Sequence, residues 1–415
     1  MLKIIGLFVF FAMPCAQAET LSSKEPVEKE KSYIEEEADL KNLQISDNAD
    51  SSLVEGKEVD LDLSENLRDV EAFWNAEFES KMFADKSSTN TILSTEISGE
   101  LKWRFLETLF IRAKGLVVGK NGFTQFIYDR TDRPSGFHLL SAFFEWKAFP
   151  NISVLIGNIQ QDFLSAPLLV TDKTFPSAIG EWAVDYFPDY DLKFLFQFAI
   201  PDNASEELRR ETQIIKVFPV FLTSSFALDT QNDFLDISIS ERFTLFQYYN
   251  LSPAVADRSR VYGNSVLRVD SDSVFKYAFF GLHNNLSFQK VLSDLWALSW
   301  GAEFIYNLMA PDTHNEGIRL YTSVYHNYKE TMEIKLTGEL FASQSDVSVA
   351  YYNSETYGHN NRKGFLARFE NHFFRSGLTL ETVFVYGKPI NEAEKSPTGE
   401  AFSFAIAVKT NNIAI

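Results

Sequence analysis

The side chains that most often carry out chemistry are sparse in this sequence. Its six histidines do not occur at metal-ligand spacing and its only cysteine is Cys15, so the sequence indicates no Cys/His metal site. It contains no G-x-S-x-G, P-loop or G-x-G-x-x-G motif, the local signatures of several large enzyme classes. A Ser-His-Asp triad stays open, since its members need not be close in sequence. We therefore expect no cofactor, no metal and no enzyme, with a barrel hydrolase as the least favoured alternative.

One segment, 161–191, concentrates carboxylates and aromatic rings. It holds six acidic residues and one basic residue, a net charge of −5. Such acids could line a narrow aqueous passage and favour cations, while the rings could stack on sugars. The alternative is that the acids are solvated and the rings lie at a membrane interface. The candidate constriction residues are Asp162, Asp172, Lys173, Glu181, Trp182, Asp185 and Tyr186.

From residue 92 onward, apolar and polar residues alternate. Between Leu93 and Phe105 the odd positions are mostly apolar and the even positions are all polar, and the alternation returns at 296–308, 332–340 and 402–409. Because successive side chains of a strand point to opposite faces, each segment predicts a strand with one polar face. The charged candidates for an inward, polar face are Glu96, Glu100, Lys102, Arg104, Arg112, Lys114, Glu333, Lys335, Glu339, Arg368 and Glu370.

Two architectures use such strands. A soluble sandwich buries the apolar face, whereas a transmembrane barrel turns it toward lipid and lines its lumen with the polar face. The expected connections alternate between long loops and short turns such as Asn121-Gly122 and Ser376-Gly377. Long loops on one rim and short turns on the other are typical of membrane barrels. We therefore predict an all-β, transmembrane, antiparallel up-and-down barrel.

We expect about eighteen strands, with sixteen as the alternative if the tight joins at 105–106 or 329–330 are not turns. Leu336 is expected to face outward and Thr337 inward. The expected strands span 92–104, 107–118, 123–130, 137–148, 152–161, 181–188, 191–200, 213–228, 234–249, 261–270, 273–283, 294–309, 317–328, 331–343, 346–353, 363–374, 377–387 and 400–411.

The N-terminal part of the chain has a different character. Residues 1–18 read as a signal peptide, with Lys3, a short apolar run and an A-x-A cleavage motif. Residues 19–71 hold 17 acidic and 6 basic residues, which predicts a disordered periplasmic leader, because little apolar burial offsets the ordering entropy. Residues 72–91 carry aromatic residues at helical spacing and are expected to form a short amphipathic helix or linker. The barrel is then expected over 92–415.

The overall composition excludes several protein classes. A formal charge of −19 argues against nucleic acid as a partner, because phosphate neutralisation needs clustered Lys and Arg. A single cysteine excludes a disulfide framework. The 39 Phe residues provide aromatic surface for a very large core or for a lipid-facing wall.

Over 92–411 the chain resembles the outer-membrane porin-type β-barrels of Gram-negative bacteria. The VLIGN stretch at 154–158, followed by the expected long loop 163–179, is similar to the strand and third loop of substrate-selective porins, where that loop folds into the lumen. The resemblance implies a channel in the outer membrane for passive diffusion of small hydrophilic solutes, such as sugars or cations. It also implies outer-membrane lipid and the barrel-assembly machinery as partners, and a homotrimer.

Two other functions stay open on the sequence alone. A structural or surface-binding barrel could have its lumen plugged, with residues 19–90 as the plug. A barrel enzyme is the weaker alternative. The acidic leader is expected to be dispensable, so that a chain starting near residue 88 should still fold.

Overall fold

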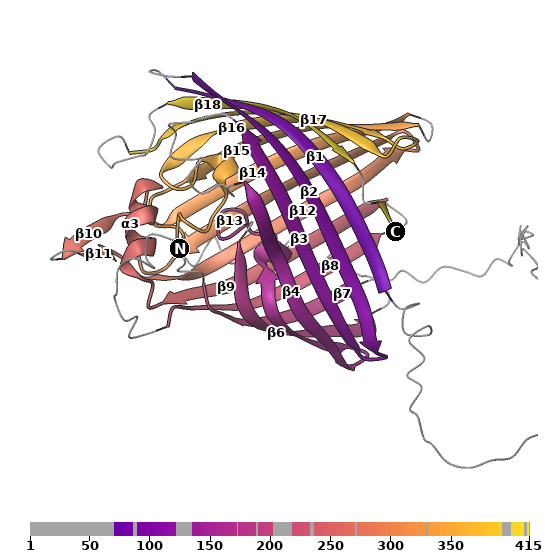
Figure 1. The fold of residues 1–415 in the computed structure, drawn as a ribbon. Helices are drawn as coiled ribbons and strands as arrows, with labels where there is room; N and C mark the ends of the chain where they lie inside the picture. The colour runs from indigo at the N-terminus through magenta and orange to yellow at the C-terminus, as the bar shows by residue number, and fades with distance from the viewer. Residues whose placement is uncertain are drawn as a thin grey trace, which may run out of the picture. The chain divides into compact units, whose positions relative to one another are not determined.

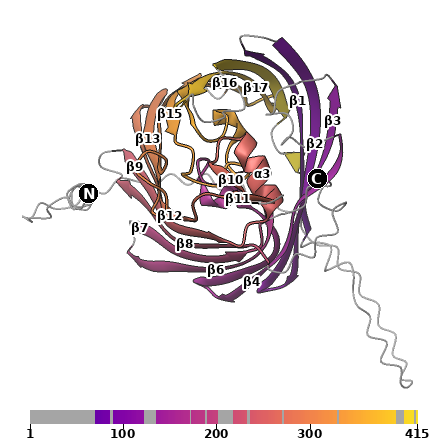
Figure 2. The same cartoon turned by 90° about the vertical axis from the view of Figure 1, so that its left-hand side faces the viewer.

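The computed structural model describes residues 70–85, 89–121, 135–171, 173–187, 190–201, 218–232, 236–269, 272–328, 331–391, 400–410 and 413–414. Antiparallel strands join into one 17-stranded sheet. Sixteen of these strands close into a barrel, because β1 pairs with both β2 and β18 (Figures 1 and 2). The predicted all-β barrel is confirmed, with the alternative count of sixteen strands in place of eighteen.

The barrel strands follow one another around the ring in chain order, and β10 and β11 form a separate hairpin. A short strand, β19 (Ile413–Ala414), adds to β1 beyond the end of β18. The barrel strands are β1 (Val70–Asp85), β2 (Thr89–Leu106), β3 (Leu109–Asn121), β4 (Gly136–Phe149), β5 (Ile152–Gln160), β6 (Thr174–Phe187), β7 (Tyr190–Ala199), β8 (Val220–Asn232), β9 (Ile237–Tyr249), β12 (Phe279–Ser293), β13 (Trp296–Asn307), β14 (Glu316–Tyr328), β15 (Met332–Ser343), β16 (Arg362–Phe373), β17 (Leu378–Pro389) and β18 (Ala401–Thr410).

The outer face of the barrel is apolar and the inner face is polar. On β15, Leu336 is 55% exposed and points outward, whereas Thr337 is 6% exposed and donates or accepts a 2.8 Å hydrogen bond with the Ser323 hydroxyl inside the wall. Phe402, Ile406 and Val408 show the same outward exposure on β18. A large exposed apolar surface around a closed sheet is what lipid contact requires.

Charge on this outer face should be costly. We expect Leu336→Arg to lower the stability of the barrel in a bilayer by roughly 2–4 kcal/mol, the cost of an Arg side chain near the membrane midplane. Thr337→Arg places the same charge in the lumen and should fold normally. Urea titration of both variants refolded into vesicles measures the difference, and equal stabilities would contradict the register of β15.

The connections sort by length, as the sequence predicted. Apart from the short β1–β2 connection, which is on the rim of the long ones, short turns lie on one rim and long connections on the other, because consecutive strands alternate in direction around the ring. Gly377 takes a φ of 63° in one tight turn, a conformation that glycine adopts without steric cost. The short turns include 107–108, 150–151, 294–295 and 374–377, and the long connections include 161–173, 250–278 and 344–361.

Several expected strands are wrong, and the errors explain the miscount. Residues 253–261 form helix α3 (Pro253–Val261), with Ser252 as its N-cap. The expected strand 261–270 holds only the hairpin strand β10 (Val266–Val269), and the expected strand 273–283 is divided between its partner β11 (Asp272–Phe275) and the start of β12. Residues 284–293, expected as a loop, belong to β12. Residues 346–353 form no strand, because their polar and apolar side chains pack into the lumen instead of alternating across a wall. The expected strand 123–130 lies outside the described residues.

The expected helix or linker at 72–91 is also wrong, because β1 occupies most of it. Its register with β2 runs from Val70↔Trp103 to Ala84↔Thr89. Trp74 and Phe78 are exposed on the outer face, and they satisfy an alternation of period two as well as a helical spacing. The barrel therefore begins at residue 70, not at 92.

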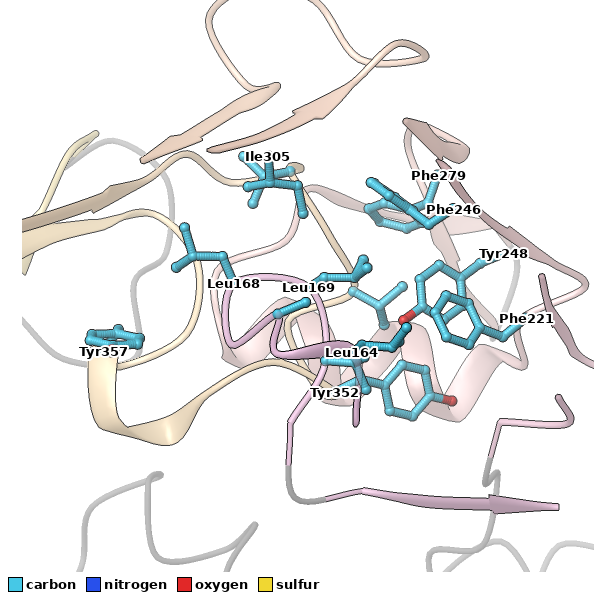
Figure 3. Packing of buried hydrophobic residues seen from close by; sticks show 14 of the residues in the cluster. Leu164, Leu168, Leu169, Phe221, Phe246, Tyr248, Phe279, Ile305, Tyr352 and Tyr357 are labelled. Carbon is cyan, nitrogen blue, oxygen red and sulfur yellow. The ribbon is translucent and has the colours of Figure 1, made fainter. Parts of the chain in front are cut away.

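An apolar core fills part of the lumen, and we call it the lumenal core. Two long connections, 161–173 and 344–361, pack there with one side of α3 against inward-facing wall residues (Figure 3). Tyr352 contacts Phe175 edge-on at 5.3 Å between centroids and stacks on Tyr248 at 5.8 Å. Since each fully buried side chain of this size contributes roughly 1.5–3 kcal/mol, the connections are held firmly. The fully or nearly fully buried members include Leu164, Leu168, Leu169, Phe221, Phe246, Phe279, Ile305, Val347, Val349 and Tyr357.

Within the described part of the chain, no helix is long and apolar enough to cross a membrane.

Candidate functional site

The inner wall carries a row of charges that crosses β16, β17, β18 and β1. The Arg368 guanidinium lies 3.2 Å from the Glu381 carboxylate, whose second oxygen lies 2.5 Å from the Lys409 ammonium. Lys409 also contacts Glu77 at 3.2 Å. We call these four residues the wall ion chain. Each carboxylate and each cation in it has an opposite charge beside it, which offsets part of the cost of removing the charges from water.

The wall residues expected from the sequence lie on the inward faces of their strands, and several of them form further ion pairs. Lys335 pairs with Glu370 at 2.9 Å across β15 and β16, and Arg112 pairs with Glu145 at 2.6 Å across β3 and β4. Part of the wall charge therefore holds neighbouring strands together. The remaining inward positions are Glu96, Glu100, Lys102, Arg104, Lys114, Glu333 and Glu339.

A second charged network anchors the two lumenal connections to the neighbouring strands β13, β14 and β15, and we call it the anchoring network. Arg319 on β14 lies between Glu303 on β13 and Glu339 on β15, at 3.3 Å and 2.7 Å. The Tyr357 hydroxyl donates to Glu339 at 2.8 Å, which fixes the 344–361 connection. The Leu168 backbone N–H donates to Glu303 at 2.9 Å, which fixes the 161–173 connection. Glu303 is fully buried, and its carboxylate also contacts the His283 imidazole at 3.0 Å. These contacts offset part of the cost of burying the carboxylate.

Buried amides and hydroxyls hold the shape of the 344–361 connection. Asn264 donates to the Ser345 and Ser348 carbonyls at 2.7 Å and 2.9 Å, and its own carbonyl accepts from the Ala350 N–H. Asn360 donates to the same two carbonyls. Because most of these bonds satisfy backbone groups that no strand pairs, the connection can be irregular and still be buried.

Burial also sets the ionisation of two groups in this connection. It lowers the pKa of His359 to about 3, with the Lys173 charge adding to the effect, so this imidazole is neutral near pH 7. The same loss of solvation raises the pKa of the Asp346 carboxyl above its ordinary range, and the N–H of Ser265, which donates to it at 2.9 Å, opposes that shift.

Space is left between the 344–361 connection and the wall formed by β1, β17 and β18. A cavity of about 40 Å³ lies beside Tyr357, and a larger one of about 150 Å³ lies beside the wall ion chain. The two cavities share Phe83, Thr356, Val385 and Ser403 in their linings, so they follow one another along the wall. We call the two together the side passage. The charged residues that line the larger cavity are Glu77, Glu79, Lys81, Arg368, Glu381 and Lys409. The smaller cavity adds the buried Arg362, which donates to the Gly387 carbonyl at 2.8 Å.

The expected constriction residues do not gather at one place. Lys173 reaches the lumen, with its ammonium 5.1 Å from the centre of the Tyr351 ring. Asp162 is exposed in a short 3-10 helix, η3 (Gln161–Leu164), and accepts a hydrogen bond from Gln160. Asp172 lies outside the described residues, and the side chains of Asp185 and Tyr186 are likewise not described.

Glu181 and Trp182 lie in a strand, and the loop expected over 163–179 is shorter because β6 begins at Thr174. Glu181 faces inward from this strand. Trp182 faces outward, is 48% exposed and stacks on Phe194 at 5.5 Å, so it does not line a lumenal constriction. It lies where an aromatic girdle of a membrane barrel is found.

Sequence reasoning missed Glu77, Glu79 and Lys81 on β1. The signal was present, because 71–84 alternates between polar and apolar residues except at Phe73 and Phe83 on the inner face and Ser80 on the outer face. The aromatic residues at helical spacing concealed it, since both periods fit a short stretch.

The fold of the barrel matches that of a solved structure. The chain superimposes on OprB of Pseudomonas putida with a TM-score of 0.58 and 10% identity, over 85% of this chain and 96% of that chain. This chain has a porin-type β-barrel fold. The resemblance found over 92–411 is thereby confirmed at the level of the fold.

Two other solved structures are similar at lower scores. They are the outer membrane channel DcaP of Acinetobacter baumannii, with a TM-score of 0.46, 12% identity and coverage of 82% of this chain and 96% of that chain, and OmpF of Salmonella typhi in complex with daunomycin, with a TM-score of 0.46, 9% identity and coverage of 82% and 97%. No family model matches the sequence, and no curated protein matches it. Function therefore has to be argued from the site itself.

The described residues contain no group of three or more His, Cys, Asp and Glu side chains that could hold a metal ion.

Proposed function

We propose that this protein is an outer-membrane porin, a channel through which small hydrophilic solutes diffuse passively. The observation that carries the proposal is the side passage, whose larger cavity of about 150 Å³ is lined by charged residues inside a membrane barrel. Paired charges of both signs can order water and contact a solute without holding it tightly, as conduction requires. The similarity of this fold to that of OprB also supports a channel function.

The proposed route runs beside the wall instead of through the centre. The lumenal core occupies the region between the 161–173 and 344–361 connections and wall strands such as β8 and β9. Solutes would therefore pass between Thr356 and the inner faces of β1, β17 and β18, where the two cavities lie. The narrower cavity beside Tyr357 would limit the size of the solute.

A barrel with a plugged lumen is the second candidate, and the lumenal core favours it. Its packing and its hydrogen bonds to the wall strands β13 and β15 could close the barrel completely. The plug expected from the sequence, residues 19–90, is corrected in part, because 70–85 is a wall strand. The 344–361 connection is the plug that the structure offers in its place.

Replacing residues 346–358 with a short Gly/Ser linker should separate the two candidates. Wild-type protein in a planar bilayer should conduct KCl, and the variant should conduct several-fold more, since the connection that narrows the lumen is gone. Single-channel recordings measure both. The barrel itself should still form, because its strand ladders do not involve these residues.

The matched control removes a part of the long-connection rim that is not in the lumenal core. Replacing 266–275, the β10–β11 hairpin, with a similar linker should leave the conductance close to that of the wild type. A silent wild type with a conducting 346–358 variant would support the plugged barrel. A silent variant would contradict the side passage and the channel together.

The remaining expectations from the sequence stay predictions. They are cleavage of the signal peptide, the disordered leader, the barrel-assembly machinery as a partner, the homotrimer, and sugars or cations as solutes.

A further inference from the structure

Two charged residues of the larger cavity differ from the other four. Glu77, Lys409, Glu381 and Arg368 neutralise one another in the wall ion chain, whereas Glu79 and Lys81 take part in no ion pair with any described residue. Glu79 has only a long 3.5 Å hydrogen bond from Ser94, and the Lys81 ammonium lies 5.0 Å from the centre of the Phe83 ring. These two side chains are therefore the ones that a solute can engage without breaking an existing pair.

The spacing of the two side chains is set by the strand. Positions 79 and 81 lie on the same face of β1, roughly 6–7 Å apart along the strand. Both line the cavity of about 150 Å³. A solute beside β1 therefore meets a carboxylate and an ammonium in succession, each half-buried, where electric fields are less screened than at an open surface.

The total charge of the larger cavity argues against a strong preference for simple ions. Its acidic residues, Glu77, Glu79 and Glu381, are balanced by Lys81, Arg368 and Lys409. A free cation is attracted by Glu79 and repelled by Lys81, so the two interaction energies largely cancel. The same holds for a free anion with the signs reversed. A solute that carries both charges, separated by several ångströms, interacts favourably with both side chains. Val385 and Phe83 line the same cavity and offer apolar contact to the uncharged part of such a solute.

We propose that the side passage favours zwitterionic solutes of the size of a dipeptide, through the unpaired Glu79 and Lys81 on β1. The solute ammonium would lie against Glu79 and its carboxylate against Lys81. This inference rests on the proposed channel function and names its solute class. It replaces the cation preference expected from 161–191, whose described acids do not line the side passage.

Swelling of phosphatidylcholine liposomes that contain the full-length protein tests the proposal. Alanyl-alanine is zwitterionic, and N-acetylalanine amide is a similarly small molecule without charges, so the two differ mainly in the property at issue. We expect alanyl-alanine to enter roughly three- to tenfold faster, the range for two part-exposed ion pairs. In the variant Glu79→Gln with Lys81→Met the ratio should fall to about one.

The matched control is Glu100→Gln with Lys114→Met. These residues face each other across β2 and β3 on the inner wall but do not line the side passage, so the ratio should keep its wild-type value. In a KCl gradient, Glu79→Gln alone should move the reversal potential toward anion preference, and Lys81→Met alone should move it toward cation preference.

The outcomes separate this inference from the proposed function. A wild type that does not conduct KCl overturns the channel itself. A conducting wild type with equal rates for the two probes, or with the ratio preserved in the Glu79 and Lys81 variant, overturns the zwitterion preference and leaves the channel standing.

Discussion

A chain that begins at residue 88 should fail to form a closed barrel. It lacks β1, which pairs with β2 over its whole length and with β18 over Glu77↔Lys409 to Asp85↔Ala401. Without β1, the neighbours β2 and β18 would run in the same direction, so the antiparallel ladder cannot be completed. Two open edges in the membrane then leave unpaired backbone groups, each costing several kcal/mol. This replaces the expectation that such a chain folds.

A chain that begins at residue 66 is the matched control. It removes the acidic segment and keeps all sixteen barrel strands, so it should fold into detergent micelles with the heat-modifiable migration of a closed barrel on cold gel electrophoresis. The chain from residue 88 should migrate as unfolded protein at all temperatures. Folded migration of the shorter chain would show that β1 is not a required part of the wall.

Removing the cation of the anchoring network should have the second largest effect. Arg319→Met leaves the buried carboxylates of Glu303 and Glu339 facing each other without a guanidinium between them. Losing one partner of a buried ion pair costs roughly 3–5 kcal/mol. We expect a loss of that size in unfolding by urea, together with new proteolytic cleavage within 161–173 and 344–361, which the network holds.

Arg368→Met provides the comparison. Arg368 is also paired with a wall carboxylate, but that residue, Glu381, keeps Lys409 as a second cation. The Arg368 side chain is also more exposed, 32% against 15% for Arg319. We therefore expect less than half the loss of stability and no new cleavage. Equal losses in the two variants would contradict the anchoring role of Arg319.

The sequence was sufficient for the all-β barrel class and for the two faces of most wall strands. Alternation of period two, as in Leu336 and Thr337, identifies the two faces of a strand because side-chain direction follows from local backbone geometry alone. The sorting of short turns and long connections then distinguished a membrane barrel from a soluble sandwich. Both signals are local, and both can be read from the sequence without knowing which strands pair.

The same local signals misled wherever two periods fit a short stretch. On β1, Trp74 and Phe78 match a helix as well as a strand, and only pairing with β2 and β18 selects the strand. At 253–261, the helical conformation of α3 depends on the capping Ser252 and on burial of Val255 in the lumenal core. Tertiary contacts of this kind outweigh weak local preference.

Only the tertiary structure decided where the candidate site lies. The sequence drew attention to 161–191 because its acids and rings are close along the chain, but Trp182 points to lipid and the lumenal part of 161–173 is apolar. The side passage instead joins β1 to β16, β17 and β18, from opposite ends of the sequence. Barrel closure brings Glu77 beside Lys409, and no local pattern records such a contact, because it depends on how many strands separate the two ends of the sheet before it closes.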